Sequence, residues 1–340
     1  MTRTIDVQTP HGPVSFHYCI STPTNDDADS VDAALPTVLF LHPAYIASSI
    51  FHPQFADPTL RRFNLVSLDL LSHGLTQGAV PAVYTEREAA EDVNAFMDAL
   101  KLPACTIFAL SMGTIIALRL ALSFPEKVNG LFLVSPLGAP EPEDAANGRR
   151  QVFEVWKEAY ASETVDQEAL SDSVFGGLQL CWNSQNFGFA NALTTITFPQ
   201  CQSHWPPANF PAFESTTVTF FTSRKGQVYT SDELDKLKKE VPIVLAPCSD
   251  DIAYPPEYFE SFARQLEGGR VMKYTLQGAP HYGSATHWEA VDPVLANFVL
   301  EQWKGASVTA APEAGSVASP FETMLREAGW TGNESDDSDD

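Results

Sequence analysis

The chain has 340 residues, 44% of them hydrophobic, so it can bury a large core and hold one large domain with an insertion, or two domains. Its 43 acidic residues outnumber its 20 lysines and arginines, and the formal net charge of −23 would repel nucleic acid and anionic lipid. We therefore expect neither nucleic acid nor a membrane as a partner.

The five cysteines are scattered and form no CxxC pair, which predicts reduced thiols rather than a disulfide framework or a zinc site. The first residues lack an apolar signal core, and no run of about 18 apolar residues occurs. From these features we expect a cytoplasmic protein without a metal site, and its oligomeric state is left open.

Strands are predicted throughout the first half of the chain. Residues Thr4–Gln8 and Val14–Ile20 alternate between polar and apolar and flank a Pro-His-Gly-Pro turn, which predicts a hairpin. The runs Thr37–Leu41 and Phe63–Leu70 are apolar without alternation, a pattern typical of parallel strands covered on both faces.

Helices are predicted between the later strands. Residues Thr85–Leu100 carry apolar residues at helical spacing, and Glu88 completes a capping box with Thr85. Cys105–Leu110 is an apolar run of strand length followed by helical spacing, and Val128–Leu137 is a further apolar strand. This alternation predicts an α/β fold, a mostly parallel central sheet with helices on both faces.

From residue 138 to residue 240 the alternation stops, and we expect an inserted helical lid over the carboxyl edge of the sheet. Arg149–Ala161 and Thr164–Leu180 have helical patterns, whereas Asn183–Pro211 is rich in proline and predicts a loop. Ser231–Glu240 predicts a short helix with Ser231 as its cap. The many aromatic residues of this lid predict an apolar pocket beneath it.

The sheet resumes in the last third of the chain, with strands expected over 241–246 and 271–276 and a final helix over 287–303. The core is thus expected to comprise residues 1–137 and 241–304. Residues 305–340 predict a flexible linker, a short helix and a disordered acidic tail.

The predicted site centres on Ser111, which lies between an expected strand and an expected helix in Ala109-Leu110-Ser111-Met112-Gly113. A chain that turns from strand to helix within one or two residues holds the residue at the bend in a strained conformation. Small residues two positions to either side let the strand and the helix approach closely. The bend would present the Ser111 hydroxyl at the carboxyl edge of the sheet.

The order of these features resembles the α/β-hydrolase fold superfamily, in its serine hydrolase form with a lid, from about residue 37 to residue 303. The resemblance rests on the serine bend, the insertion, and an Asp and then a His that each follow a strand. It implies that Ser111 is the nucleophile, His281 its base, and Asp251 the acid that orients the imidazole. Asp250 and His287 are the alternatives. His281 is preferred because it follows the last strand directly, and Asp251 because it opens an Asp-x-x-x-Pro stretch typical of the family.

The resemblance also implies two N–H donors for the oxyanion of an acyl-transfer intermediate. Met112, directly after the nucleophile, would supply one. The second falls to Ala44, two residues after His42, because Pro43 has no N–H. We expect His42 chiefly to hold its loop, and we name His42 and Tyr45 as candidates for the substrate pocket.

Taken together, the resemblance implies a serine hydrolase without a cofactor. Its substrate would be a medium-sized, apolar small molecule with a carboxylic ester or related acyl bond, cleaved through an acyl-enzyme. Ser at the bend argues against the relatives of this fold that use Asp there, the epoxide hydrolases and dehalogenases. Two alternatives stay open: a C–C bond hydrolase for β-diketone-like substrates with the same triad, and a non-catalytic ligand-binding protein.

Overall fold

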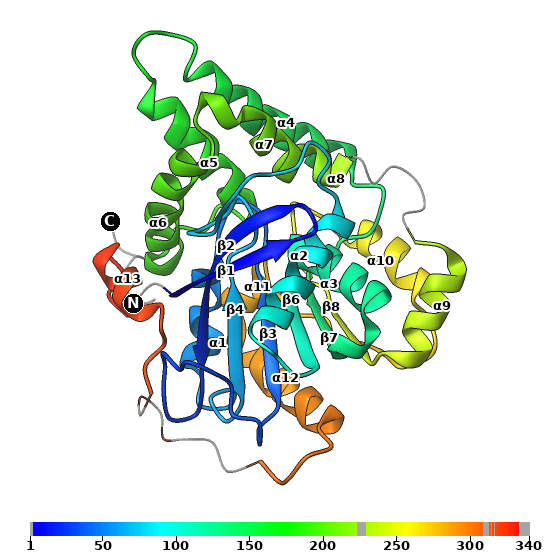
Figure 1. Cartoon of the computed structure of the whole chain (residues 1–340). Helices are drawn as coiled ribbons and strands as arrows, with labels where there is room; N and C mark the ends of the chain where they lie inside the picture. The colour runs from blue at the N-terminus through cyan, green and yellow to red at the C-terminus, as the bar shows by residue number, and fades with distance from the viewer. Residues whose placement is uncertain (1–2, 223–228, 309–312, 314, 316, 333–340) are drawn as a thin grey trace.

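The computed structural model describes residues 3–222, 229–308, 313, 315 and 317–332. Its centre is a twisted sheet in the order β1-β2-β4-β3-β6-β7-β8-β9 (Figure 1). The expected hairpin is present as β1 (Arg3–Thr9) and β2 (Gly12–Ser21), and β2 pairs antiparallel with β4 (Asn64–Leu68) and with the short β5 (Gln77–Gly78).

All other neighbouring strands of this sheet run parallel. They are β3 (Thr37–Leu41), β6 (Cys105–Leu110), β7 (Val128–Val134), β8 (Ile243–Ala246) and β9 (Val271–Lys273). Every residue of β3, β4, β6 and β8 is buried, as their continuous apolar runs require. The predicted α/β architecture with a mostly parallel sheet is therefore confirmed.

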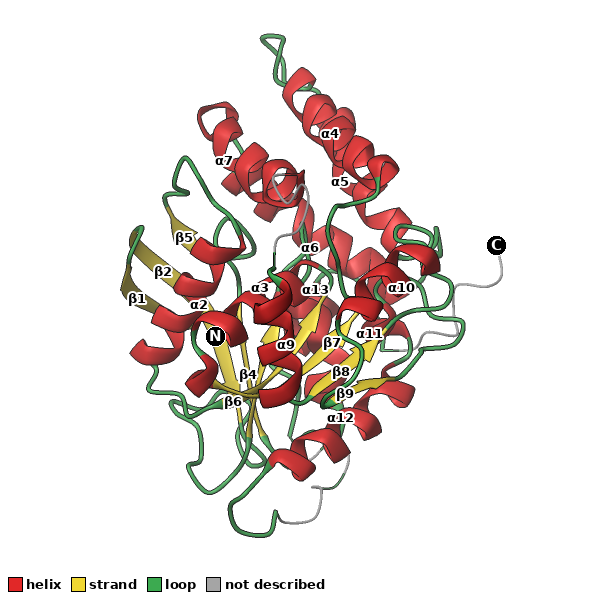
Figure 2. Ribbon diagram, turned by 90° about the vertical axis from the view of Figure 1, so that its right-hand side faces the viewer, coloured by secondary structure: helices red, strands yellow, loops and turns green. Residues whose placement is uncertain are grey.

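Helices cover both faces of the sheet (Figures 1 and 2). One face carries α2 (Glu86–Ala99), α3 (Met112–Ser123) and α9 (Ser231–Glu240), and the other carries α1 (His52–Ala56), α11 (Gly283–Thr286) and α12 (Trp288–Gln302). The predicted capping box of Thr85 and Glu88 opens α2. The cap of α9 is Thr230 and not Ser231, because Thr230 forms a capping box with Glu233 three residues on.

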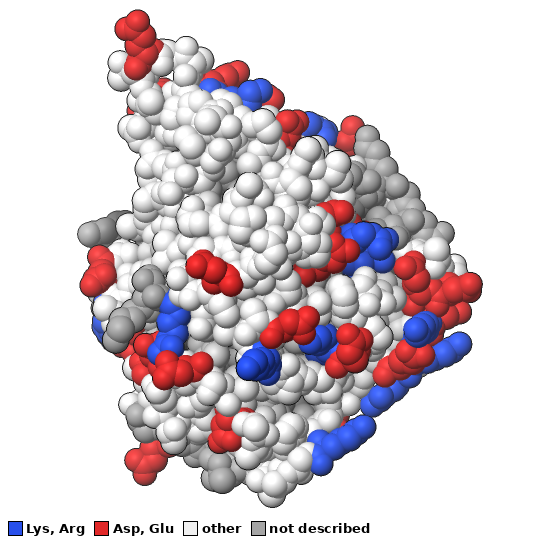
Figure 3. Space-filling model, viewed as in Figure 1, with Lys and Arg blue, Asp and Glu red and all other residues white. Residues whose placement is uncertain are grey.

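The α-helices between β7 and α9 stand beyond the carboxyl ends of the parallel strands, at the top of Figure 1. We call them the inserted helices: α4 (Glu143–Glu158), α5 (Gln167–Cys181), α6 (Gly188–His204), α7 (Phe210–Glu214) and α8 (Phe220–Thr222). In the view of Figure 3 the surface over α5 and α6 is largely uncharged, whereas acidic and basic side chains gather over α9.

The prediction of a loop over Asn183–Pro211 is wrong, because α6 occupies most of that stretch and contains Pro199. Proline removes one backbone donor from a helix and normally disfavours it. Here Phe189, Leu193 and Ile196 are buried on one side of α6, and this packing outweighs the local penalty.

The described part of the chain after α12 returns to the body. Helix α13 (Glu322–Glu327) follows Phe321, whose ring packs 5.2 Å from that of Phe55 in α1. Beyond α13, the Trp330 ring lies 4.5 Å from the ring of His52 in α1 and 6.0 Å from that of Phe189 in α6. This segment therefore touches both the core and the inserted helices. The predicted acidic tail lies outside the described residues, as does part of the linker.

Two predictions from composition can be compared with the structure. All five cysteines are free thiols. Among the described residues, no helix combines the length and the apolar composition that crossing a bilayer requires.

Candidate active site

Ser111 lies at the bend between β6 and α3, with φ 53° and ψ −115°. This left-handed conformation is strained for a residue with a Cβ. The Ser111 N–H donates to the carbonyl of Val134 at 3.1 Å, and the N–H and hydroxyl of Thr114 donate to the Ser111 carbonyl at 2.8 and 2.6 Å. Gly113 lets α3 pass close to β3, because a Cβ there would overlap the carbonyl oxygen of Leu41.

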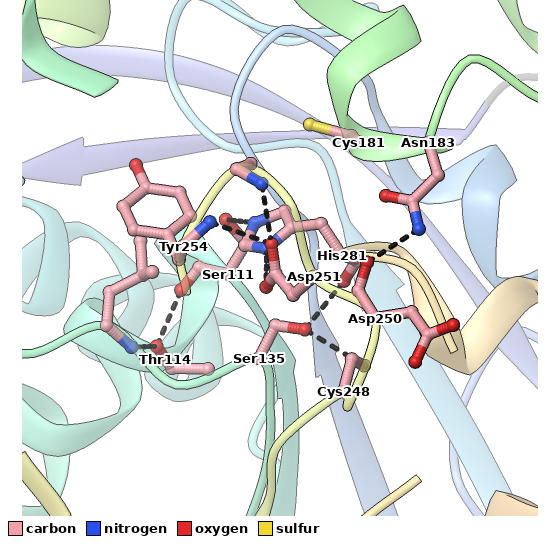
Figure 4. Close-up of polar contacts among 12 residues, drawn as sticks. Ser111, Thr114, Ser135, Cys181, Asn183, Cys248, Asp250, Asp251, Tyr254 and His281 are labelled. Atoms are coloured by element: carbon pink, nitrogen blue, oxygen red, sulfur yellow. Dashed lines mark hydrogen bonds and ion pairs between the residues drawn. The ribbon is translucent and has the colours of Figure 1, made fainter. Parts of the chain in front are cut away.

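The side chains of Ser111, His281 and Asp251 lie in a row at the carboxyl edge of the sheet (Figure 4). His281 Nε2 is 2.7 Å from Ser111 Oγ, and His281 Nδ1 is 2.6 Å from Asp251 Oδ2. All three residues are buried. A carboxylate only accepts hydrogen bonds, so Nδ1 carries the proton and Nε2 is free to accept the Ser111 hydroxyl proton. The arrangement can activate a serine hydroxyl as a nucleophile.

Backbone donors hold the carboxylate of this row. Asp251 Oδ1 accepts from the N–H of Ala253 at 3.0 Å and from that of Tyr254 at 2.8 Å. The Asp251 side chain is therefore fixed at one oxygen by its own loop and at the other by His281.

Two further residues position His281. The ring of Tyr254 stacks on the imidazole with centroids 5.0 Å apart, and Ser135 Oγ donates to the His281 carbonyl at 2.6 Å. Ser135 follows β7 with φ 46°. Sequence reasoning missed both residues. For Ser135 the available signal was a polar residue directly after a buried strand that neighbours β6.

The alternatives Asp250 and His287 lie elsewhere. Asp250 is exposed, and its carboxylate accepts the hydroxyl of Ser249 at 2.8 Å. The Nδ1 of His287 lies 2.8 Å from Thr286 Oγ1, at the start of α12. The structure thus brings Asp251 and His281 to Ser111 and leaves both alternatives outside the row.

The sequence assigned Met112 and Ala44 to an oxyanion hole. Met112 is the first residue of α3, where N–H groups have no acceptor within the helix. Ala44 lines the same cavity as Ser111.

Among the described residues, His42 is not one of those that line a cavity of about 560 Å³ beside Ser111. It is completely buried; its Nδ1 donates to the carbonyl of Pro43 at 2.7 Å, and its Nε2 accepts the N–H of Leu70 at 2.8 Å. Burial lowers the pKa of His42, which suits a neutral ring with one donor and one acceptor nitrogen. His42 therefore ties its own loop to the one after β4.

A cavity of about 560 Å³ lies between this row and the inserted helices α4 and α5. Apolar side chains and glycines form much of its wall, and Tyr45, Tyr254 and Tyr282 add aromatic rings. Tyr45, named from the sequence as a pocket candidate, lines this cavity.

A mostly buried cation borders the cavity. Arg149 of α4 donates from Nε to Glu141 at 2.8 Å and from Nη2 to the Tyr254 hydroxyl at 2.6 Å. Its guanidinium also lies 3.5 Å from the centroid of the Phe221 ring. Burial would lower the pKa of Arg149, but the surrounding Tyr254 and Glu141 raise it well above its usual value, so the group stays charged.

Comparison with known proteins places this site in a family. The sequence model of the alpha/beta hydrolase fold matches residues 36–287, and the chain belongs to this family.

Two curated relatives illustrate its range. The putative carbamate hydrolase RutD of Pantoea ananatis is 23% identical over 260 residues, covering 75% of this chain and 85% of that protein. The probable lysophospholipase BODYGUARD 2 of Arabidopsis thaliana is 29% identical over 202 residues, covering 53% of this chain and 42% of the relative. The match therefore spans less than half the length of the plant protein.

Solved structures share the fold. A thermophilic esterase from Thermogutta terrifontis superposes with a TM-score of 0.64 at 19% identity, covering 88% of this chain and 99% of the esterase. Naproxen esterase from Bacillus subtilis gives a TM-score of 0.61 at 17% identity, covering 88% of this chain and 91% of that one.

Proposed function

We propose that this protein is a serine hydrolase that cleaves a carboxylic ester or a related acyl bond of a medium-sized, largely apolar molecule. The observation that carries the proposal is the hydrogen-bonded row Ser111–His281–Asp251 at a strained bend, with contacts of 2.7 and 2.6 Å. The esterase, lysophospholipase and carbamate hydrolase activities named for its relatives support the same class of reaction.

The row suggests a two-step mechanism. Ser111 Oγ attacks the substrate carbonyl while His281 Nε2 takes the hydroxyl proton, and Asp251 stabilises the imidazolium that forms. The N–H groups of Met112 and Ala44 would receive the oxyanion. Collapse of the intermediate expels the alcohol, which takes the proton from His281. A water molecule then attacks the acyl-enzyme with the same base and releases the acid.

The cavity supports a medium-sized substrate, because its volume of about 560 Å³ is in the range of small-molecule sites. Its roof comes from α4 and α5, so we propose that residues 138–240 act as the lid over a core of residues 1–137 and 241–304. The five free thiols suit the reducing cytoplasm, which is the location we propose.

A fluorophosphonate probe tests the nucleophile. We expect covalent labelling of the folded protein at Ser111, found by mass spectrometry of peptides, and loss of labelling in Ser111→Ala. Ser173 also lines the cavity, so Ser173→Ala is the matched control that should still be labelled. A folded wild-type protein that stays unlabelled would contradict the proposal.

Substrate assays separate this function from its alternatives. A series of p-nitrophenyl esters of increasing acyl length should show kcat/KM rising beyond acetate, as an apolar cavity predicts. Cleavage of a β-diketone with no ester turnover would instead indicate the C–C hydrolase. Tight ligand binding with no turnover of either would indicate a binding protein.

A further inference from the structure

Helix α5 ends beside the hydrogen-bonded row and contacts the two loops that carry its acid and its base (Figure 4). The side-chain amide of Asn183 donates to the Asp250 carbonyl at 2.6 Å. The carbonyl of Cys181 accepts the N–H of Tyr282 at 3.1 Å. Asp250 directly precedes the acid of the row, and Tyr282 directly follows its base. The end of this inserted helix is therefore bonded to both loops, one residue away from the reacting groups.

The backbone of Asn183 closes α5 in a conformation that usually belongs to glycine. Its φ is 53°, its N–H donates to the Leu180 carbonyl at 3.3 Å, and the N–H of Ser184 donates to the Gln179 carbonyl at 2.8 Å. These two bonds define a Schellman motif, in which glycine is the commonest residue at the left-handed position because it has no Cβ. An asparagine here adds a side chain that the helix end itself does not need.

The bond made by that side chain holds the backbone next to the acid. The Asp250 carbonyl belongs to the peptide bond that leads into Asp251, and the Asp250 N–H donates to the Ala279 carbonyl at 3.0 Å. Any shift of this backbone would move the Asp251 carboxylate relative to His281 Nδ1, which lies 2.6 Å away. Small displacements of this kind lower the rate of an enzymatic reaction considerably.

Packing keeps the Asn183 amide in place. The neighbouring Trp182 is buried, and its ring meets that of Tyr282 edge to face with centroids 4.9 Å apart and that of Phe187 at 5.4 Å. The end of α5 is therefore a rigid support for the acid loop, which is what precise positioning of a reacting group requires.

We propose that Asn183 is a positioning residue for the reaction: its amide fixes the backbone that leads into Asp251 and keeps this carboxylate in contact with His281. The inference rests on the proposed function and adds a residue of the inserted segment that sets the rate. Asn183 is not one of the described residues that line the cavity beside Ser111, so it acts through the acid and not on the substrate.

Asn183→Gly tests this inference, because glycine suits the left-handed position but has no side-chain donor. On p-nitrophenyl hexanoate, kcat should fall about 10-fold, as expected when one hydrogen bond that holds a reacting group is lost. The KM should change less than about 2-fold, since ground-state binding is untouched. The urea concentration at the midpoint of unfolding should stay the same or rise, which excludes poor folding as the cause of the lower rate.

Ser184→Gly is the matched control. Ser184 is also left-handed, with φ 58°, but its side chain is exposed, so kcat should be retained. Asn183→Asp keeps the shape of the side chain and removes the donor, and it should lose at least as much activity as Asn183→Gly. The inference is overturned if kcat is unchanged in both Asn183 variants, or if Ser184→Gly loses as much as they do.

An NMR measurement separates failure of this inference from failure of the proposed function. The proton between His281 Nδ1 and Asp251 gives a far-downfield ¹H resonance while the two groups stay in contact, whether or not an ester is turned over. Asp251→Asn should remove this resonance, Asn183→Gly should shift or broaden it, and Ser184→Gly should leave it unchanged. A wild-type protein without turnover and without label at Ser111 would refute the proposed function, whereas an unchanged resonance in Asn183→Gly would overturn this inference alone.

Discussion

The core and the inserted helices contribute to the site in opposite ways, and glycine shows the difference best. In the core, a Cβ on Gly113 would overlap the backbone of Leu41, whereas Gly148 and Gly176 of the inserted helices have no described atom within 4 Å of a Cβ. Close packing of the core fixes the conformation of the reacting side chains. The inserted helices leave space for a ligand. We infer that the core determines the reaction and the inserted helices determine the substrate.

The largest effect on activity is expected when the carboxylate of Asp251 in the core is replaced. Asp251→Asn should lower kcat about 10⁴-fold, because an amide cannot hold the imidazole in the tautomer that accepts the serine proton. Asp250→Asn is the adjacent control, and its exposed side chain should change kcat less than about 2-fold. Steady-state kinetics on one p-nitrophenyl ester measures both. Equal losses in the two variants would mean that the acid has been misassigned.

Replacing a glycine by alanine should have opposite effects on stability in the core and in the inserted helices. Gly113→Ala should lower the free energy of unfolding by about 3 kcal/mol or more, since backbone atoms cannot move away from the new methyl group. Gly148→Ala should raise it by about 0.5–1 kcal/mol, because alanine favours an exposed helix. Urea unfolding curves measure both values. A loss of stability in Gly148→Ala would contradict the contrast between the two regions.

A pH titration tests the contact between the regions at His52. Burial lowers the pKa of His52 from 6.5 to about 4; of the two smaller influences, Glu322 raises this pKa and Arg326 lowers it further. The folded protein therefore binds fewer protons than the unfolded chain between these values, so stability is full above pH 6.5 and falls as the pH drops towards 4.

Between pH 6.5 and 4, we expect His52 to lower the free energy of unfolding by on the order of 2–3 kcal/mol. Urea unfolding at pH 7, 5.5 and 4.5 should show a weaker pH dependence in His52→Gln than in the wild-type protein. Parallel curves for the two proteins would show that His52 is not shielded from water by Trp330.

The smallest effect concerns the support of the base. Ser135→Ala removes the hydrogen bond to the His281 carbonyl and should lower kcat about 10-fold with little change in KM. Ser173→Ala, whose hydroxyl donates to the Leu170 carbonyl within its own helix, is the control and should keep kcat. A change in KM alone would assign Ser135 to substrate binding instead of positioning.

The core could be predicted from sequence because its signals are local. Buried parallel strands appear as unbroken apolar runs, and the residues that follow such strands meet at one edge of the sheet. Ser111, Asp251 and His281 each follow a predicted strand, and the resemblance to the α/β-hydrolase family then implied their roles. The capping box of α2 was readable for the same reason, since Thr85 and Glu88 are three residues apart.

The parts that could not be predicted depend on tertiary contacts. Pro199 suggested a loop, but the burial of Phe189 and Leu193 stabilises a helix around it. His42 was expected to hold its own loop, but its second partner, the N–H of Leu70, lies on another loop and could not be read from the sequence. Ser135 belongs to no motif, because its partner is a carbonyl group far along the chain.

The segment from Ser319 to Trp330 packs against α1 and α6 and so holds the end of the described chain on the body of the protein. Ser319 Oγ lies 3.0 Å from His52 Nδ1, Phe321 rests on α1, and Trp330 reaches α6. A chain truncated before Ser319 would expose the rings of His52 and Phe55 on α1 to water. Such a truncated protein should bind the dye ANS and self-associate, whereas a protein that carries a tag beyond residue 332 should do neither.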